Sequence, residues 1–153
     1  MTAPTKAANS PFVATSGQLA TFRLDGDLYG VEVEHVQEVL KSQGLTRVPL
    51  APAAVAGLIN LRGQVVTAIE LRERLGRPPR PEGTDAVVIV VRLHGEAVSL
   101  LVDSIADVVD VDAADFEAPP DTLEGQARDL IRGAYKLDGQ LLLALDVQKA
   151  VSA

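Results

Sequence analysis

The chain has 153 residues, of which 47% are hydrophobic, enough to build a packed interior, and its formal net charge at pH 7 is −7. This acidic balance argues against nucleic acid as a partner, because a negatively charged surface repels the phosphate backbone. The absence of cysteine excludes disulfides and thiolate chemistry, and no segment has the run of about 20 apolar residues that a membrane helix needs. We therefore expect a cytoplasmic protein without direct membrane insertion.

The first elements along the chain are a tail and a β-hairpin. Residues 1–17 are rich in Ala, Thr, Pro and Ser and have little periodicity, which predicts a flexible N-terminal tail. Residues 21–24 and 28–31 read as strands, and Asp25-Gly26-Asp27 between them is typical of a turn. Because glycine takes positive φ at no steric cost, this pattern predicts two antiparallel strands joined by a tight turn.

The next segment predicts a short helix and a second pair of strands. The valines within residues 33–40 recur at helical spacing with polar residues between them, which indicates an amphipathic helix. A proline-marked loop then leads to residues 55–69, which read as two strands around the turn Arg62-Gly63. A short helical turn is expected over residues 70–75.

Residues 77–83 form the clearest boundary in the chain, because they contain three prolines, which fix φ and cannot donate to a β-ladder. After this boundary the same order of elements recurs. The expected elements are a strand over 86–92, a turn over 94–96, a strand over 98–102, a helix over 104–109, an acidic loop over 110–123, two strands within 131–145 and a helical turn over 146–151.

The two halves align with each other as an internal repeat. At an offset of 69 residues, residues 22–27 lie over residues 91–96, and at an offset of 76 the turn glycine Gly63 lies over Gly139. The two halves agree in the order of their elements, in the positions of their turn glycines and in the spacing of their apolar residues, which indicates a duplicated unit. We predict two small β-barrels, residues 18–82 and 83–153, that share a hydrophobic core because a unit of about 65 residues is marginal alone.

Several segments carry a resemblance to a known family. They are Gly57-Leu58-Ile59-Asn60-Leu61-Arg62-Gly63, Tyr29-Gly30-Val31, Val36-Gln37-Glu38-Val39, Val102-Asp103 and Leu143-Ala144-Leu145-Asp146. Together they resemble the CheW family of chemotaxis coupling proteins, and the resemblance extends over residues 18–151. Two positions depart from the family pattern: Thr67 stands where proline is usual and Glu70 where aspartate is usual. Whether they mark a specialised branch stays open at this point.

The resemblance implies a single CheW-like domain with a mainly β fold. Two pseudo-repeated, five-stranded, Src-homology-like β-barrels would pack around a shared hydrophobic core, with a few short helices. It further implies a non-catalytic adaptor that needs no cofactor or metal. The implied partners are the regulatory domain of a CheA-type histidine kinase and the cytoplasmic tip of a chemoreceptor, assembled in membrane-associated arrays.

Arg62 is the first candidate binding residue. Its guanidinium can make two parallel hydrogen bonds to a carboxylate, either on a partner or on Glu38 within the chain. The alternative is a surface salt bridge that contributes little. With the positions that the resemblance and the valine pattern add, the candidate partner-binding residues are Val33, Val36, Glu38, Val39, Gly57, Asn60, Arg62, Val102, Ile105 and Val108.

Two interpretations stand for the apolar members of this set. The valines and Ile105 either line a groove in which an amphipathic receptor helix docks or belong to the core. Gly57 either allows the close approach of a partner's backbone in this groove or is a simple strand or bulge glycine.

The remaining polar clusters read as solvated surface. His35 and His94 occupy non-equivalent places in the repeat, and the acidic residues within 107–117 lack the pattern of a calcium loop. The arginines within 72–80 read as a basic surface patch. We find no motif for phosphate binding or nucleophilic catalysis. Two alternatives stay open: an adaptor of a chemosensory-type pathway with a non-swimming output, and a barrel that binds a small molecule or catalyses a reaction.

Overall fold

The computed structural model describes residues 17–41, 44–123 and 125–152. The predicted tail, residues 1–17, therefore lies outside the described residues except for Gly17, which begins the first strand. None of the helices in the described part of the chain is long and apolar enough to cross a membrane.

The fold is mainly β, which confirms the predicted class. The first part of the chain forms β1 (Gly17–Leu24), β2 (Asp27–Glu32), the 3₁₀ turn η1 (Val33–His35), β3 (Val36–Leu40), β4 (Val55–Leu61), β5 (Gln64–Glu70) and α2 (Leu71–Arg74). The second part forms β6 (Val87–Leu93), β7 (Glu96–Val102), β8 (Ser104–Val111), the 3₁₀ turn η2 (Ala113–Asp115), β9 (Phe116–Glu117), α3 (Gly125–Leu130), β10 (Ile131–Leu137), β11 (Gln140–Leu145) and α4 (Val147–Val151).

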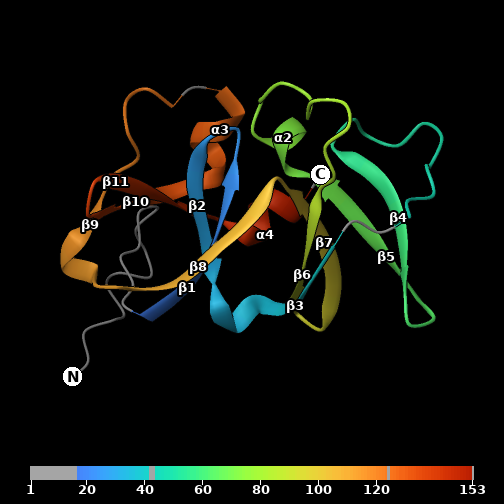
Figure 1. Cartoon of the computed structure of the whole chain (residues 1–153), viewed down its shortest axis with the longest axis horizontal. Helices are drawn as coiled ribbons and strands as arrows, with labels where there is room; N and C mark the ends of the chain where they lie inside the picture. Colours follow the sequence, from blue (N-terminus) through green and yellow to red (C-terminus); the bar gives the residue numbers. More distant parts are fainter. Residues whose placement is uncertain (1–16, 42–43, 124, 153) are drawn as a thin grey trace.

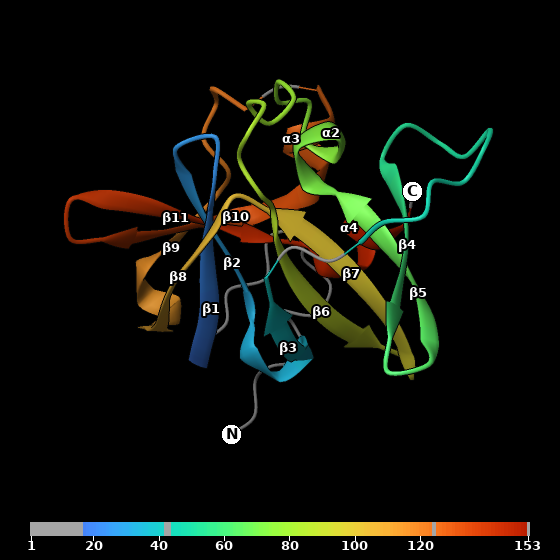
Figure 2. The ribbon, with the colours of Figure 1, turned by 45° about the vertical axis from the view of Figure 1, so that its right-hand side comes forward.

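These strands form two sheets, which lie side by side in Figures 1 and 2. The strand order is β8-β1-β2-β11-β10-β9 in the six-stranded sheet and β3-β6-β7-β5-β4 in the five-stranded sheet. Each sheet is antiparallel except for one parallel pair at its centre, β2 with β11 and β5 with β7. Apart from the two-residue strand β9, the two sheets therefore have the same topology.

The first hairpin of each half is exchanged between the sheets. Strands β1 and β2 pair with β8 and β11 from the second half, whereas β6 and β7 pair with β3 and β5 from the first half. The sequence repeat identifies equivalent segments but not which of them pair. Both predicted units, 18–82 and 83–153, contribute strands to both sheets, so the division between them does not separate the sheets.

The helices predicted over 33–40 and 104–109 were wrong, because both segments are mostly strands. Val, Ile and Thr favour strands because a branched Cβ packs well on a pleated surface. Each of the two strands contains a β-bulge. Val36 and Glu38 are two residues apart in β3 but pair with adjacent residues of β6. Ile105 and Val108 are three residues apart in β8 but pair with residues of β1 that are only two apart. One extra residue shifts the two-residue alternation and produces the spacing of three that imitates a helix.

The predicted hairpin turns and terminal helical turns are present. Glu70 accepts a hydrogen bond from the amide of Arg72 at the start of α2, and Asp146 accepts one from the amide of Lys149 at the start of α4. Glu70, which stands where the family usually has aspartate, therefore caps its helix as an aspartate would. Thr67 lies within β5 and pairs with residues of both β4 and β7, so the position where the family usually has proline is part of a continuous ladder.

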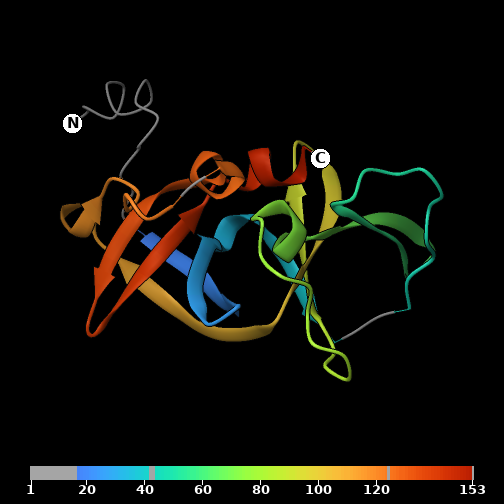
Figure 3. The ribbon, with the colours of Figure 1, turned by 90° about the horizontal axis from the view of Figure 1, so that it is seen from above.

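One hydrophobic core extends across both sheets. It contains Leu24 and Leu143 from the six-stranded sheet together with Ile89 and Leu100 from the five-stranded sheet, all of them buried. Viewed from above, the short helices α2, α3 and α4 lie over the centre of the molecule, where the sheets meet (Figure 3). The predicted shared core is confirmed, and because the hairpins are exchanged, each sheet contains strands from both halves.

Candidate partner-binding surface

The turn between β4 and β5 presents Arg62 to solvent. Arg62 has a φ of 50° and the following Gly63 a φ of 85°, so two successive residues occupy the left-handed region. Asn60 stabilises this turn because its Oδ1 accepts a hydrogen bond of 3.0 Å from the amide of Gly63. Asn60 therefore has a structural role in placing Arg62.

Arg62 and Glu38 form a bidentate ion pair. The two guanidinium nitrogens lie 2.6 and 2.7 Å from the carboxylate oxygens of Glu38, and the side chain of Arg62 remains 73% exposed. Glu38 belongs to β3 and Arg62 follows β4, so the pair joins the two outer strands of the five-stranded sheet. The hydrogen bonds from Arg62 lower the pKa of Glu38 below its ordinary value.

Exposed aliphatic side chains lie on one outer strand of each sheet. Val39 on β3 is 45% exposed, and Ile105 and Val108 on β8 are 42% and 56% exposed. An outer strand also leaves backbone donors and acceptors without a ladder partner, which makes it a natural docking edge. Val33 and Val36 are only half-buried and flank the first of these edges.

Two candidate residues do not lie at the surface. Val102 is fully buried in the shared core, so its assignment to partner binding was wrong: the end of β7 packs inward between the sheets. Gly57 is also buried, and an added Cβ would lie 2.5 Å from the backbone oxygen of Thr46. The backbone that approaches Gly57 belongs to this chain, and Gly57 lies at a β-bulge of β4, which favours the interpretation of a strand or bulge glycine.

The arginines within 72–80 are not a solvated patch. Arg72 is only 6% exposed and forms a bidentate ion pair with Asp103, at 2.6 and 2.9 Å. Arg80 joins Asp103 to Glu70, and Arg77 donates to Asp25, Asp27 and the hydroxyl of Tyr29. The sequence pattern did not indicate this cluster, because Asp25, Asp27 and Asp103 come from segments distant from the arginines.

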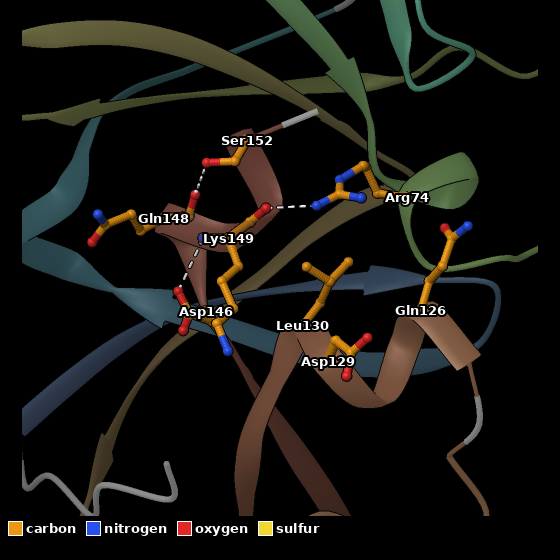
Figure 4. Close-up of a pocket in the computed structure, with 8 residues that line it drawn as sticks. All are labelled: Arg74, Gln126, Asp129, Leu130, Asp146, Gln148, Lys149 and Ser152. Atoms are coloured by element: carbon orange, nitrogen blue, oxygen red, sulfur yellow. Dashed lines mark hydrogen bonds between the residues drawn. The ribbon is translucent and has the colours of Figure 1, made fainter. Parts of the chain in front are cut away.

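An open hollow lies between α2, α3 and α4 (Figure 4). It has a volume of about 610 Å³, and polar side chains line most of it. Arg74 donates to the carbonyls of Lys149 and Ala150 and so stabilises the end of α4. Within the part of the chain that the structure describes, no three His, Asp or Glu side chains lie close enough together to hold a metal ion.

Comparison with known proteins relates this architecture to one family. A family model described as a CheW-like domain matches residues 18–153. The chain is 31% identical over 140 residues to the chemotaxis protein CheW of Treponema pallidum, covering 89% of this chain and 82% of that protein. It is 29% identical over 134 residues to the chemotaxis protein CheW of Bacillus subtilis, covering 88% and 86%.

A solved structure shows the same fold. The scaffolding protein TtCheW from Thermoanaerobacter tengcongensis superimposes with a TM-score of 0.76 at 29% identity, covering 86% of this chain and 90% of that one. Together these matches define the class as a non-catalytic chemotaxis scaffold built from two β-sheets. The chain belongs to the CheW family, and its role is that of an adaptor in chemotaxis signalling.

Proposed function

We propose that this chain links the cytoplasmic tip of a chemoreceptor to the regulatory domain of a CheA-type histidine kinase, in receptor arrays at the membrane. An adaptor can transmit a signal only if its contacts differ between the two states of the kinase. The chain would do so by holding kinase and receptor in one geometry, so that a change in the receptor shifts the equilibrium of the kinase.

The observation that carries this proposal is the presence of two docking edges in separate sheets. The β3 edge comprises Glu38, Val39 and Arg62, and the β8 edge comprises Ile105 and Val108. Each edge combines exposed aliphatic area with charge, as binding surfaces commonly do. Because the edges belong to different sheets, two partners can bind at the same time.

The chemistry of the two edges favours a different partner for each. On β8, the exposed Ile105 and Val108 are interspersed in sequence with the exposed Asp107 and Asp110, so this strand combines apolar and acidic side chains. An amphipathic helix with basic residues beside its apolar face fits such a surface, and a receptor tip is helical in this family. We therefore assign the receptor to the β8 edge and the kinase domain to the β3 edge with its ion pair.

The test is titration of the purified chain with each partner and with both together. We expect the kinase domain and a receptor-tip fragment to bind separately, and neither to displace the other. Absence of binding to the kinase domain at about 50 µM, corresponding to an affinity weaker than about −6 kcal/mol, would contradict the proposal. Mutual displacement of the partners would contradict the assignment to separate edges.

A further inference from the structure

The chain crosses between the two sheets at two places. It passes from β2 to β3 through η1, and from β7 to β8 at the single residue Asp103. The two crossings are equivalent in the internal repeat, because Asp103 aligns with Glu34 at the offset of 69. Their side-chain surroundings are different.

Asp103 is bonded to groups on both sides of the crossing. Its Oδ1 accepts from Nε of Arg72 at 2.9 Å and from Nε of Arg80 at 3.1 Å, and its Oδ2 accepts from Arg72 at 2.6 Å. The same Oδ2 accepts from the backbone amide of Asp25 at 2.8 Å, and the amide of Asp103 donates to the carbonyl of Arg23 at 3.1 Å.

The two arginines are fixed to the five-stranded sheet. Arg72 lies in α2, which continues directly from β5, and it also donates to the carbonyls of Pro78 and Pro79. Arg80 makes two hydrogen bonds to Glu70, the last residue of β5. Arg23 and Asp25, by contrast, belong to the β1–β2 hairpin of the six-stranded sheet. Asp103 therefore connects the ends of two different sheets.

The other crossing differs, because within the part of the chain that the structure describes the side chain of Glu34 makes no hydrogen bond or ion pair. The residue that aligns with Arg72 at the offset of 76 is Gln148, which is exposed on α4, and Glu34 is exposed on η1. Near this crossing Glu32 lies 3.5 Å from His35 and 3.3 Å from Arg132, and all three residues belong to the first half's hairpin and turn or to the six-stranded sheet. Of the two crossing residues, Asp103 is therefore the one that joins the sheets through side-chain hydrogen bonds.

We infer that Asp103, held by Arg72 and Arg80, is a positioning residue that fixes the orientation of the two sheets and hence of the two docking edges. The inference rests on the proposed function, in which each edge holds a different partner. Loosening this crossing leaves each edge intact but allows the edges to move relative to each other. Binding to either partner alone then persists, whereas receptor control of the kinase is lost.

The structural test measures the relative orientation of the sheets directly. Because the sequence has no cysteine, Gln18→Cys on β1 and Gln64→Cys on β5 place one spin label on each sheet without removing native thiols. Pulsed electron paramagnetic resonance then gives the distribution of distances between the labels. We expect Asp103→Asn to broaden this distribution, and the matched control Asp85→Asn, at an exposed carboxylate, to leave it unchanged.

The functional test uses reconstituted complexes of the full chain with kinase and receptor. For Asp103→Asn we expect affinities for each single partner within about twofold of the native chain, and receptor control of kinase activity reduced at least about fivefold. Asp85→Asn should retain native control. If Asp103→Asn proves unfolded by circular dichroism, Arg80→Gln removes one contact of the same cluster and is measured in both tests instead.

The outcomes separate this inference from the proposed function. An unchanged distance distribution in the folded variant overturns the positioning role, whatever the native chain binds. A broadened distribution with full receptor control overturns the link between orientation and signalling. If the native chain binds neither partner, the proposed function fails and the orientation result stands alone.

Discussion

The β4–β5 turn of the five-stranded sheet and the β10–β11 turn of the six-stranded sheet are equivalent in the repeat, but their charges are opposite. Arg62 in the first turn aligns with Asp138 in the second, and its partner Glu38 aligns with Asp107. Two carboxylates cannot form the ion pair that joins the outer strands of the five-stranded sheet. In the second sheet β9 instead pairs with β10 at that edge.

This difference separates the requirements of the fold from those of recognition. Both sheets keep the same strand order, the same bulges and the same capped helical turns. What differs lies at the outer strands, at the turn tips and at the two crossings. Duplication has therefore preserved one topology in both sheets, and their edges and crossings have diverged in charge.

The largest effect on stability should come from the Asp103 crossing. Arg72→Ala leaves a partly buried carboxylate without its bidentate partner, and we expect the free energy of unfolding to fall by about 3–5 kcal/mol. The equivalent change on α4, Gln148→Ala, should alter it by less than about 0.5 kcal/mol. Chemical denaturation measures both, and equal losses would refute the asymmetry between the two crossings.

Acid should weaken the same crossing. Burial alone would raise the pKa of Asp103, but hydrogen bonds from Arg72 and the amide of Asp25 outweigh it and lower the pKa to about 2. Because the folded value lies below the unfolded value of 3.8, this carboxylate stabilises the native state above about pH 4, and the contribution disappears as pH falls toward 2.

The expected contribution is about 2 kcal/mol at neutral pH, since a shift of one pKa unit corresponds to about 1.4 kcal/mol. The measurement is the free energy of unfolding between pH 2 and pH 6 for the native chain and for Asp103→Asn. The difference between the two proteins should shrink as pH falls. A difference that stays constant over this range would show that the ionised form of Asp103 is not what stabilises the crossing.

Two equivalent glycines should behave alike although the edges around them differ. A Cβ on Gly57 would lie 2.5 Å from the oxygen of Thr46, and one on Gly133 would lie 2.6 Å from the oxygen of Glu117. We expect Gly57→Ala and Gly133→Ala each to cost about 1–3 kcal/mol of unfolding free energy. Gly44→Ala, where nothing lies within 4 Å, is the control. If the unfolding free energy falls at only one of the two glycines, the close backbone approach is not a shared feature of the two halves.

Much of the element order could be predicted from the sequence, because turn glycines and local polarity determine hairpins. The pairing of those hairpins could not, since β2 meets β11 through contacts more than 100 residues apart, such as Leu28 with Leu142. The bulges in β3 and β8 disguised strands as helices. The burial of Arg72 depends on Asp103, 31 residues further along the chain, and no local pattern indicates that contact.

Only some of the candidate partner-binding residues lie where the sequence predicted them. Glu38 and Arg62 are brought together as an internal ion pair, and Ile105 and Val108 on β8 are exposed. Val102, at the end of β7, is instead buried in the core. Successive side chains of a strand point to opposite faces of the sheet, and this alternation decides which valine faces solvent. A segment that is predicted to be a helix does not reveal that alternation.

The smallest effect on stability, and the sharpest on binding, should come from the docking edges themselves. Arg62→Ala removes an exposed guanidinium from the β3 edge, so the melting temperature should change by less than about 4 °C. We expect affinity for the kinase domain to fall about tenfold, and affinity for the receptor tip to stay native. Lys136→Ala, which removes an exposed ion pair with Glu117 outside both edges, should leave both affinities unchanged.

The complementary change is Val108→Asp on the β8 edge, which adds a charge to the exposed apolar area. It should weaken the receptor tip about tenfold and spare the kinase domain, because a charge at the centre of an apolar contact must be desolvated. Isothermal titration of the three variants with each partner gives the full comparison. If both variants weaken the same partner, the two edges form one surface, and the equivalent sheets would then share a single recognition role instead of dividing it.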